Sequence, residues 1–214
     1  MNKRQAKKNL KRKNMELVAK YPWVLPRNRW SDKVSPDYNY DFTELDAIPD
    51  GWMKAFGMQM VDEINDELVK TNTMDSFRVT QIKEKYGRLE FYTYGGSSEV
   101  FEIIEDYGNI SENICIRCGK LDVPIICNNG WYEPICKCCY EKQEDRMIKM
   151  GYGKSRFTYE DLVKNMKYES EDYSLPTVRK WTRWHTDENG ERIEEHLERD
   201  LTDKVNKIRK KGGK

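Results

Sequence analysis

Two pairs of cysteines, each pair separated by two residues, constrain this chain more than any other feature. The pairs are Cys115 with Cys118 and, after seventeen intervening residues, Cys136 with Cys139. Two residues between cysteines allow one tight turn to aim both sulfur atoms at one ion, and zinc prefers four such ligands in a tetrahedron. Four thiolates leave no open coordination position, so the pattern predicts a structural zinc ion that takes no part in catalysis.

The residues around these pairs predict a small zinc-binding module over residues 113–150. Residues 123–127 and 131–135 have the pattern of a β-hairpin with a turn at 128–130, and the second cysteine pair opens a helix that runs to about Met150. Knuckle, hairpin and helix together predict a treble clef or zinc ribbon. Cys127 and Cys138 leave an alternative in which one of them replaces a nominal ligand; otherwise they are free buried thiols.

The segment before this module predicts an α+β domain over residues 15–112. Residues 15–50 are rich in aromatic residues, Pro, Asn and Asp, which indicates an ordered loop around a core. Between 52 and 70 an apolar residue recurs every fourth position, as in an amphipathic helix. A β-hairpin with its turn at Tyr86 and Gly87 follows over 76–94, and then a helix capped by Ser97 or Ser98.

Residues 151–214 predict a small C-terminal α/β extension. A short helix begins at Thr158 and continues to Lys167, with Asp161 completing a capping box. A second hairpin turns at Asn189 and Gly190. A helix over 194–210 fits the end of the chain nearly as well, because its apolar residues lie along one stripe.

The charge of the chain is strongly segregated, although its formal net charge is only +1. Residues 1–14 carry seven basic side chains and residues 204–214 carry six, both without an acid, so the body between them has a charge near −12. We therefore expect a flexible basic tail over 1–14 and another at the C-terminus. Such runs indicate contact with nucleic acid or an acidic partner through Lys7, Lys8, Lys11 and Lys210; the alternative is solvated tails that bind nothing.

A second candidate contact lies in the C-terminal extension, where tryptophans alternate with basic residues. Its members are Arg179, Trp181, Arg183 and Trp184. Such a segment can stack on bases while it neutralises phosphates. The alternative is a half-buried strand with one solvated face.

Other candidates for chemistry are weaker. His185 and His196 have no evident partner, which favours surface or packing roles. An acidic string could bind Mg²⁺ in an enzyme, but it lacks the spacing of a calcium loop, and a solvated acidic loop is the preferred interpretation. Its members are Asp37, Asp41, Glu44, Asp46 and Asp50. No apolar run approaches the ~20 residues of a membrane span, and the N-terminus has no apolar signal segment, so we expect a cytoplasmic protein without membrane contact.

Four segments resemble a family of uncharacterised proteins encoded by bacteriophages and prophages. They are residues 21–30, 40–52, 81–92 and 115–119, and the resemblance spans about residues 15–142. It implies a mobile-element origin, a bacterial host cytoplasm and a zinc knuckle behind a small α/β unit. It implies no activity and no catalytic residues.

Three functions follow as hypotheses. The first is an accessory protein with structural zinc that acts by binding a nucleic acid. The second is an inhibitor of a host defence system, of the anti-CRISPR or anti-restriction type, which binds a host protein complex through its acidic body. The third is a Mg²⁺-dependent enzyme that uses the acids between Asp37 and Asp50. Action by binding, without catalysis, is the preferred interpretation.

Overall fold

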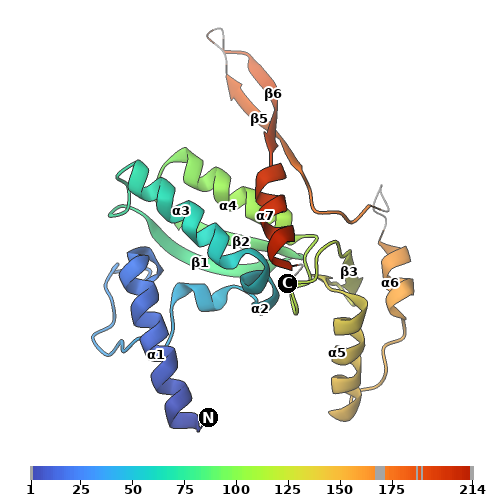
Figure 1. The fold of residues 1–214 in the computed structure, drawn as a ribbon. Coiled ribbons are helices and arrows are strands. Elements are labelled where there is room, and N and C mark those ends of the chain that lie inside the picture. Colours follow the sequence, from blue (N-terminus) through green and yellow to red (C-terminus); the bar gives the residue numbers. More distant parts are fainter. Residues whose placement is uncertain (1, 167–171, 187, 189, 213–214) are drawn as a thin grey trace.

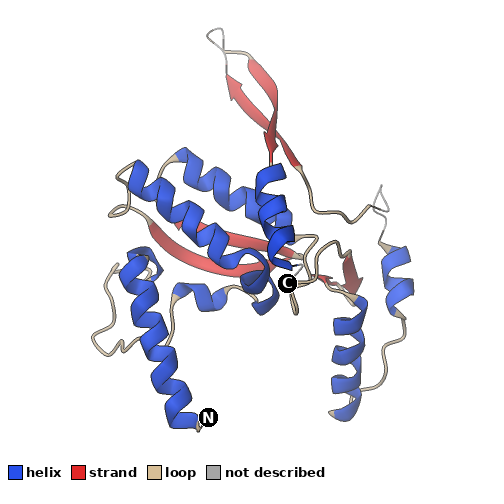
Figure 2. Cartoon of the chain, viewed as in Figure 1, coloured by secondary structure: helices blue, strands red, loops and turns tan. Residues whose placement is uncertain are grey.

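In a computed structural model the chain is described over residues 2–166, 172–186, 188 and 190–212. This part of the chain has an α+β fold, in which helices surround small antiparallel hairpins (Figures 1 and 2). The described strands form three separate two-stranded sheets, and each sheet pairs strands that are consecutive in the sequence. The expected α+β class is confirmed.

One long helical segment lies at the centre of the main core. It begins with α2 (Asp50–Trp52), passes through a π-helical turn at Met53–Gly57, and continues as α3 (Met58–Lys70). The predicted apolar stripe is confirmed, since all of its members are buried: Trp52, Phe56, Met60, Ile64 and Leu68. The helix therefore exists because one of its faces packs against the rest of the core.

The first hairpin and its following helix complete this core. Strands β1 (Arg78–Lys85) and β2 (Arg88–Tyr94) pair across a turn at Tyr86 and Gly87, which both have positive φ, as the tight turns of hairpins require. Helix α4 (Ser98–Ser111) starts where the Ser97 side chain accepts a hydrogen bond from the Val100 amide. Helices α3 and α4 cover one face of the hairpin (Figure 1). Hairpin and helix were both predicted.

The N-terminal residues are helical, which corrects the expected flexible tail over 1–14. Helix α1 runs from Lys3 to Lys20, and Asn2 caps it by accepting the Gln5 amide. The segment contains neither Pro nor Gly, so nothing interrupts the helix between its charged first turns and its docked end. Asn14 is buried and donates a hydrogen bond to the Tyr40 carbonyl, and Leu17 and Val18 pack on the main core.

The predicted loop over 15–50 starts later than expected, because residues 15–20 belong to α1. From Tyr21 on it is irregular, apart from two short 3₁₀ turns at Pro22–Val24 and Glu44–Ala47. It contributes several buried side chains to the main core, namely Tyr21, Trp23, Val24, Leu45 and Ile48. The loop is ordered because these residues anchor it.

A second, smaller core surrounds the cysteines. It contains β3 (Ile125–Asn128), β4 (Trp131–Pro134), α5 (Lys137–Lys149) and α6 (Tyr159–Asn165). Thr158 and Asp161 form the predicted capping box of α6; the predicted end of that helix at Lys167 lies outside the described residues. The buried members of this core are Cys115, Val123, Ile126, Ile135, Cys136, Tyr140 and Leu162.

The end of the chain combines both structures that we considered for it. Strands β5 (Val178–Thr186) and β6 (Arg192–Asp200) form the predicted hairpin, which projects from the molecule as an arm (Figure 1). Helix α7 (Thr202–Gly212) then returns to the main core. Of the predicted arm turn, Gly190 is described and Asn189 lies outside the described residues.

The basic C-terminal segment is therefore not a tail. Leu201, Val205 and Ile208 are buried in the main core, and their spacing accounts for the docking of α7. Residues 151–214 also do not pack as one extension, because Leu162 of α6 belongs to the cysteine core whereas α7 belongs to the main core.

Candidate metal centre

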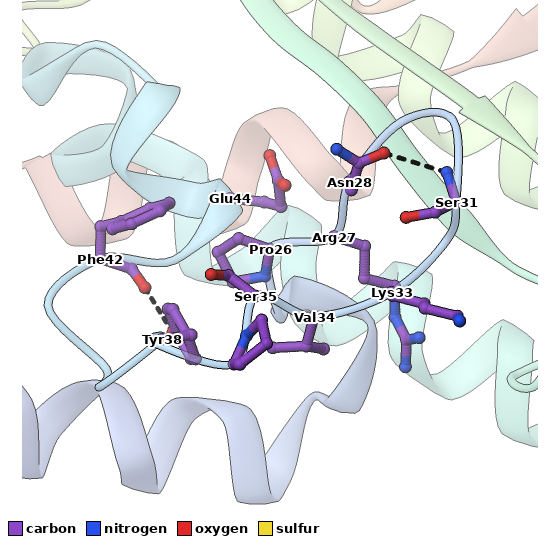
Figure 3. A pocket seen from close by; sticks show the side chains of 11 residues that line it. Pro26, Arg27, Asn28, Ser31, Lys33, Val34, Ser35, Tyr38, Phe42 and Glu44 are labelled. Carbon is purple, nitrogen blue, oxygen red and sulfur yellow. Dashed lines mark hydrogen bonds between the residues drawn. The ribbon is translucent and has the colours of Figure 1, made fainter.

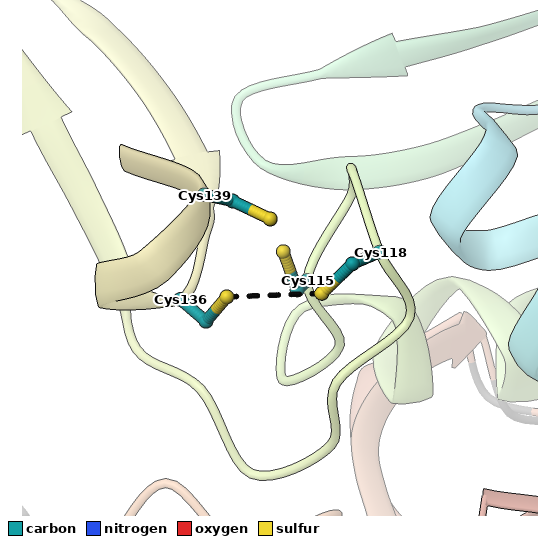
Figure 4. A group of neighbouring side chains, drawn as sticks. All are labelled: Cys115, Cys118, Cys136 and Cys139. Carbon is teal, nitrogen blue, oxygen red and sulfur yellow. Dashed lines mark hydrogen bonds between the residues drawn. The ribbon is translucent and has the colours of Figure 1, made fainter. Parts of the chain in front are cut away.

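The four predicted cysteines come together in one cluster. The sulfur atoms of Cys115, Cys118, Cys136 and Cys139 all lie within 4.8 Å of one another (Figure 4). The Sγ atoms of Cys118 and Cys136 are 3.7 Å apart. Zn–S bonds of about 2.3 Å in a tetrahedron place sulfur atoms about 3.8 Å apart, whereas a disulfide holds them at about 2.05 Å. The cluster is thus positioned to bind a metal ion and is compatible with zinc.

Local backbone structure aims these sulfurs. Residues 115–119 form a tight turn, here called the knuckle, in which the Gly119 amide donates to the Cys115 carbonyl over 2.9 Å. Gly119 has a φ of +80°, a conformation that glycine adopts without strain. Cys136 is the N-cap residue of α5, and Cys139 lies in the first turn of that helix. Each cysteine pair therefore occupies one sharp change of chain direction.

Burial and hydrogen bonds shift the pKa values of the cluster thiols in opposite directions. Burial, reinforced by the neighbouring thiols of Cys118 and Cys136, raises the pKa of Cys139. Burial acts in the same direction on Cys115, but hydrogen bonds from backbone amides outweigh it and lower the pKa of that thiol. A divalent ion favours the thiolate form at every position because it offsets their charge.

The two remaining cysteines lie outside the cluster. Cys138 lies between Cys136 and Cys139 in the sequence but is exposed, because neighbouring residues of a helix point in different directions. Cys127 lies on β3, opposite Tyr132 of β4. The alternative in which either replaces a nominal ligand does not match this arrangement.

Hydrogen bonds from α2 attach the knuckle and the residue before it to the main core. The Gly51 amide donates to the Ile116 carbonyl over 3.0 Å, and the Trp52 indole donates to the Ile114 carbonyl over 2.9 Å. A β-carbon on Gly51 would lie 2.2 Å from the Cys115 carbonyl oxygen. Only glycine therefore permits this close approach between α2 and the knuckle.

This contact gives a prediction for Gly51→Ala. We expect the variant to lose about 1–3 kcal/mol of unfolding free energy, because backbone on both sides has to move apart. Urea denaturation followed by circular dichroism measures the change. Gly153→Ala is the matched control, since no atom lies within 4 Å of its β-carbon position. Equal stability of the two variants would contradict the close approach.

The acidic string does not assemble a magnesium site. A cavity of about 650 Å³ lies within the loop that carries it (Figure 3), but of the five acids only Glu44 lines this cavity, together with the cations Arg27 and Lys33. Asp41 instead accompanies Lys7 and Lys11 of α1, at 3.8 and 3.5 Å, and Asp46 caps Thr43. In the described part of the chain, the four cysteines are the only group of metal-ligand type.

Neither histidine has a catalytic arrangement. Both lie on the exposed arm, His185 on β5 and His196 on β6. The His196 ring contacts the Thr182 hydroxyl at 3.3 Å and lies 3.9 Å from the Glu194 carboxylate. The predicted surface role fits these positions.

The predicted contact residues on α1 lie along one side of that helix. Arg4, Lys7, Lys8, Lys11 and Arg12 are spaced i, i+3, i+4, i+7 and i+8. We call them the basic stripe. All are exposed except the half-buried Lys11, and among the described residues only Asp41 and the exposed Glu16 provide acidic partners. Lys210 is exposed on α7.

The structure separates the predicted arm residues into a buried base and an exposed outer part. Arg179 is buried, and its guanidinium pairs with Glu102 and Asp106 of α4, so it is unable to meet a ligand. Its ring contact with Trp181, at 4.1 Å, belongs to the same packed base of the arm. Further out, Arg183 and Trp184 lie opposite the acids Glu195 and Glu194.

The carboxylates of these acids repel the phosphates of a nucleic acid, so the exposed part of the arm is poorly suited to stacking on its bases. Sequence reasoning missed the buried role of Arg179, although a signal existed: Glu99, Glu102 and Asp106 lie on one side of α4, where they can receive a cation.

No helix among the described residues combines the length and apolar character needed to cross a bilayer. No family model, curated protein or solved structure matches the chain.

Proposed function

We propose that the protein binds nucleic acid through the basic stripe of α1, and that the cysteine cluster holds a structural zinc ion in a treble-clef module. The observation that carries the first part is the stripe itself, a set of five cations on one side of a docked helix. Phosphate contacts from such a stripe supply affinity without sequence specificity. The bacteriophage or prophage origin stays a prediction.

The order of elements supports the treble clef. The first cysteine pair lies in the knuckle, a hairpin follows as β3 and β4, and the second pair opens α5. Four cysteine ligands would close the coordination sphere of zinc, so the ion would stabilise the module and carry no reaction.

The position of α1 supports a role in contact. Its second half is fixed to the main core through Asn14, Leu17 and Val18, whereas its first turns lead away from the body (Figure 1). The stripe is thus presented on a helix that is already formed, and less conformational entropy is lost on binding than for a disordered tail.

The test is the triple variant Arg4→Gln, Lys8→Gln, Arg12→Gln. We expect its affinity for short DNA or RNA to fall about tenfold or more at low salt, and the salt dependence of binding to become less steep by about one for each lost phosphate contact. Fluorescence anisotropy over a salt series measures both quantities.

Lys13→Gln is the control, since this lysine is exposed but lies on another side of α1. No mobility shift of the wild-type protein with DNA or RNA at low salt would refute the proposed function.

A second candidate function is inhibition of a host defence complex by protein binding. The β5–β6 arm favours it, because exposed Trp184 and Ile193 accompany the acids Glu194 and Glu195 on a projecting hairpin. An acidic arm can occupy a basic groove of another protein. Affinity capture from host lysates with wild-type protein and with Trp184→Ala distinguishes this candidate, which fails when both recover the same proteins.

A further inference from the structure

Two cavities adjoin the cysteine cluster, and cations line both. The cavity next to Cys118 has a volume of about 390 Å³ and contains Lys54, Lys120 and Lys211. The cavity next to Cys139 has a volume of about 310 Å³ and contains Arg117, Lys142 and Arg146. Within the described ranges of the chain, no acidic residue lines either cavity. We call these six residues the knuckle cations.

Three different parts of the chain contribute to this surface. Lys54 comes from the π-helical turn, Lys211 from the end of α7, and Lys142 and Arg146 from one side of α5. The knuckle joins them, since Arg117 lies within it and the Lys54 ammonium donates to the Cys118 carbonyl over 3.3 Å. All six side chains are exposed. The surface therefore depends on the tertiary fold and was not visible as a run of charge in the sequence.

The positive charge exceeds what the metal centre requires. Zinc with four thiolates carries two negative charges, which nearby cations can offset. Arg117 also pairs with Glu133 at 2.7 Å and lines a third cavity with Asp46, Asp50 and Glu84, so acids on that side balance its charge. The five other knuckle cations outnumber the two negative charges of the zinc site by three. Since exposed cations repel one another, an excess gathered around one short loop is best stabilised by an external polyanion.

We propose that the knuckle cations form a second nucleic-acid site, in which phosphates of one backbone occupy the two cavities beside Cys118 and Cys139. Arginine and lysine in open cavities suit phosphate oxygens, Arg146 through paired N–H donors and Lys142 as a point charge. The open, acid-free walls allow a strand to pass across the knuckle. The inference goes beyond the α1 site, and it rests on the proposed function only in taking nucleic acid as the ligand.

The test compares two double variants of the full zinc-loaded chain, Lys142→Gln with Arg146→Gln and Lys54→Gln with Lys211→Gln. Each is expected to weaken binding of a labelled DNA duplex or single strand about tenfold, and to reduce the salt slope by about two. Lys164→Gln with Lys207→Gln is the control, because both lysines are exposed and line neither cavity. Zinc content is measured for every variant.

The outcomes separate this inference from the proposed function. Knuckle variants that bind DNA as the control does, while the α1 triple variant does not, would overturn the inference and leave the α1 site intact. The reverse result would support the knuckle site and remove the α1 site. The charge-conserving variants Lys142→Arg and Arg146→Lys separate the effect of charge from that of zinc content. If the DNA affinity of the variants follows their zinc content and not their charge, the cations act only on the cysteine cluster, and the inference is overturned. Wild-type protein that binds polyglutamate but no DNA would identify an acidic protein partner and overturn it as well.

Discussion

Cys115→Ser and Cys136→Ser are each expected to abolish stable zinc binding and to unfold the module around it. Structural zinc contributes on the order of 10 kcal/mol of apparent binding free energy at neutral pH, which is comparable to the whole stability of a domain. Both residues are buried in the smaller core, which has few other apolar members. We expect the purified wild-type chain to hold about one zinc ion and each variant almost none. Elemental analysis and thermal unfolding measure these results.

The matched controls are Cys127→Ser and Cys138→Ser. Both remove a thiol from the same part of the chain, but neither sulfur belongs to the cluster. Zinc content should therefore stay unchanged in both. Hydrogen exchange should localise the damage of the ligand variants to β3, β4, α5 and α6, while α3 and α4 stay protected. Zinc loss in Cys138→Ser, or full zinc occupancy in Cys136→Ser, would contradict the proposed ligand set.

Local patterns explain why the metal centre and the hairpins were predictable. A Cys-x-x-Cys pair defines its own turn, and a turn such as Tyr86–Gly87 between two β-rich runs defines its own register. The stripe from Trp52 to Leu68 likewise needs only the period of a helix. Such features depend on residues close in sequence, so no knowledge of the tertiary structure is required.

The basic ends show where composition was misleading. The charge runs favour disorder because like charges repel, but the spacing of the residues within them has helical periods. The cations Arg4, Lys8 and Arg12 lie along one side of α1. In α7, Val205 and Ile208 are spaced i, i+3 and are buried. Each helix is anchored to the core, and this anchoring outweighs the repulsion between its cations. The repulsion is weak because the cations are exposed and salt screens them.

Nonlocal ion pairs account for the failure at Arg179. Strand alternation places Arg179 and Arg199 directly opposite each other, an unfavourable pair in isolation. Acids of α4 make this arrangement possible, and nothing local to the arm reveals their position. The knuckle cations were unpredictable for the same reason, because only the tertiary fold brings α7 next to the knuckle.

A buried charge network holds the arm to α4. Asp106 is fully buried; its carboxylate lies 3.0 Å from Arg179, 2.8 Å from Arg199 and 3.7 Å from Lys204. Burial raises the pKa of Asp106, and the three cations oppose that shift. At the edge of the network the Glu99 carboxylate accepts a hydrogen bond from the Arg199 guanidinium, which lowers the pKa of Glu99. An isolated two-stranded hairpin is marginally stable in water, so the arm depends on these contacts at its base.

Asp106→Asn is therefore expected to cost about 3–5 kcal/mol of unfolding free energy, because it leaves buried cations without their shared counter-charge. Urea denaturation measures the loss, and hydrogen exchange should show faster opening of β5 and β6. Glu198→Gln is the control: it breaks the exposed pair with Lys180 and should cost less than about 1 kcal/mol. The double variant with Arg179→Gln should lose less than the sum of the two single variants, since both remove the same interaction. A cost for Asp106→Asn equal to that of the control would show that the network does not hold the arm.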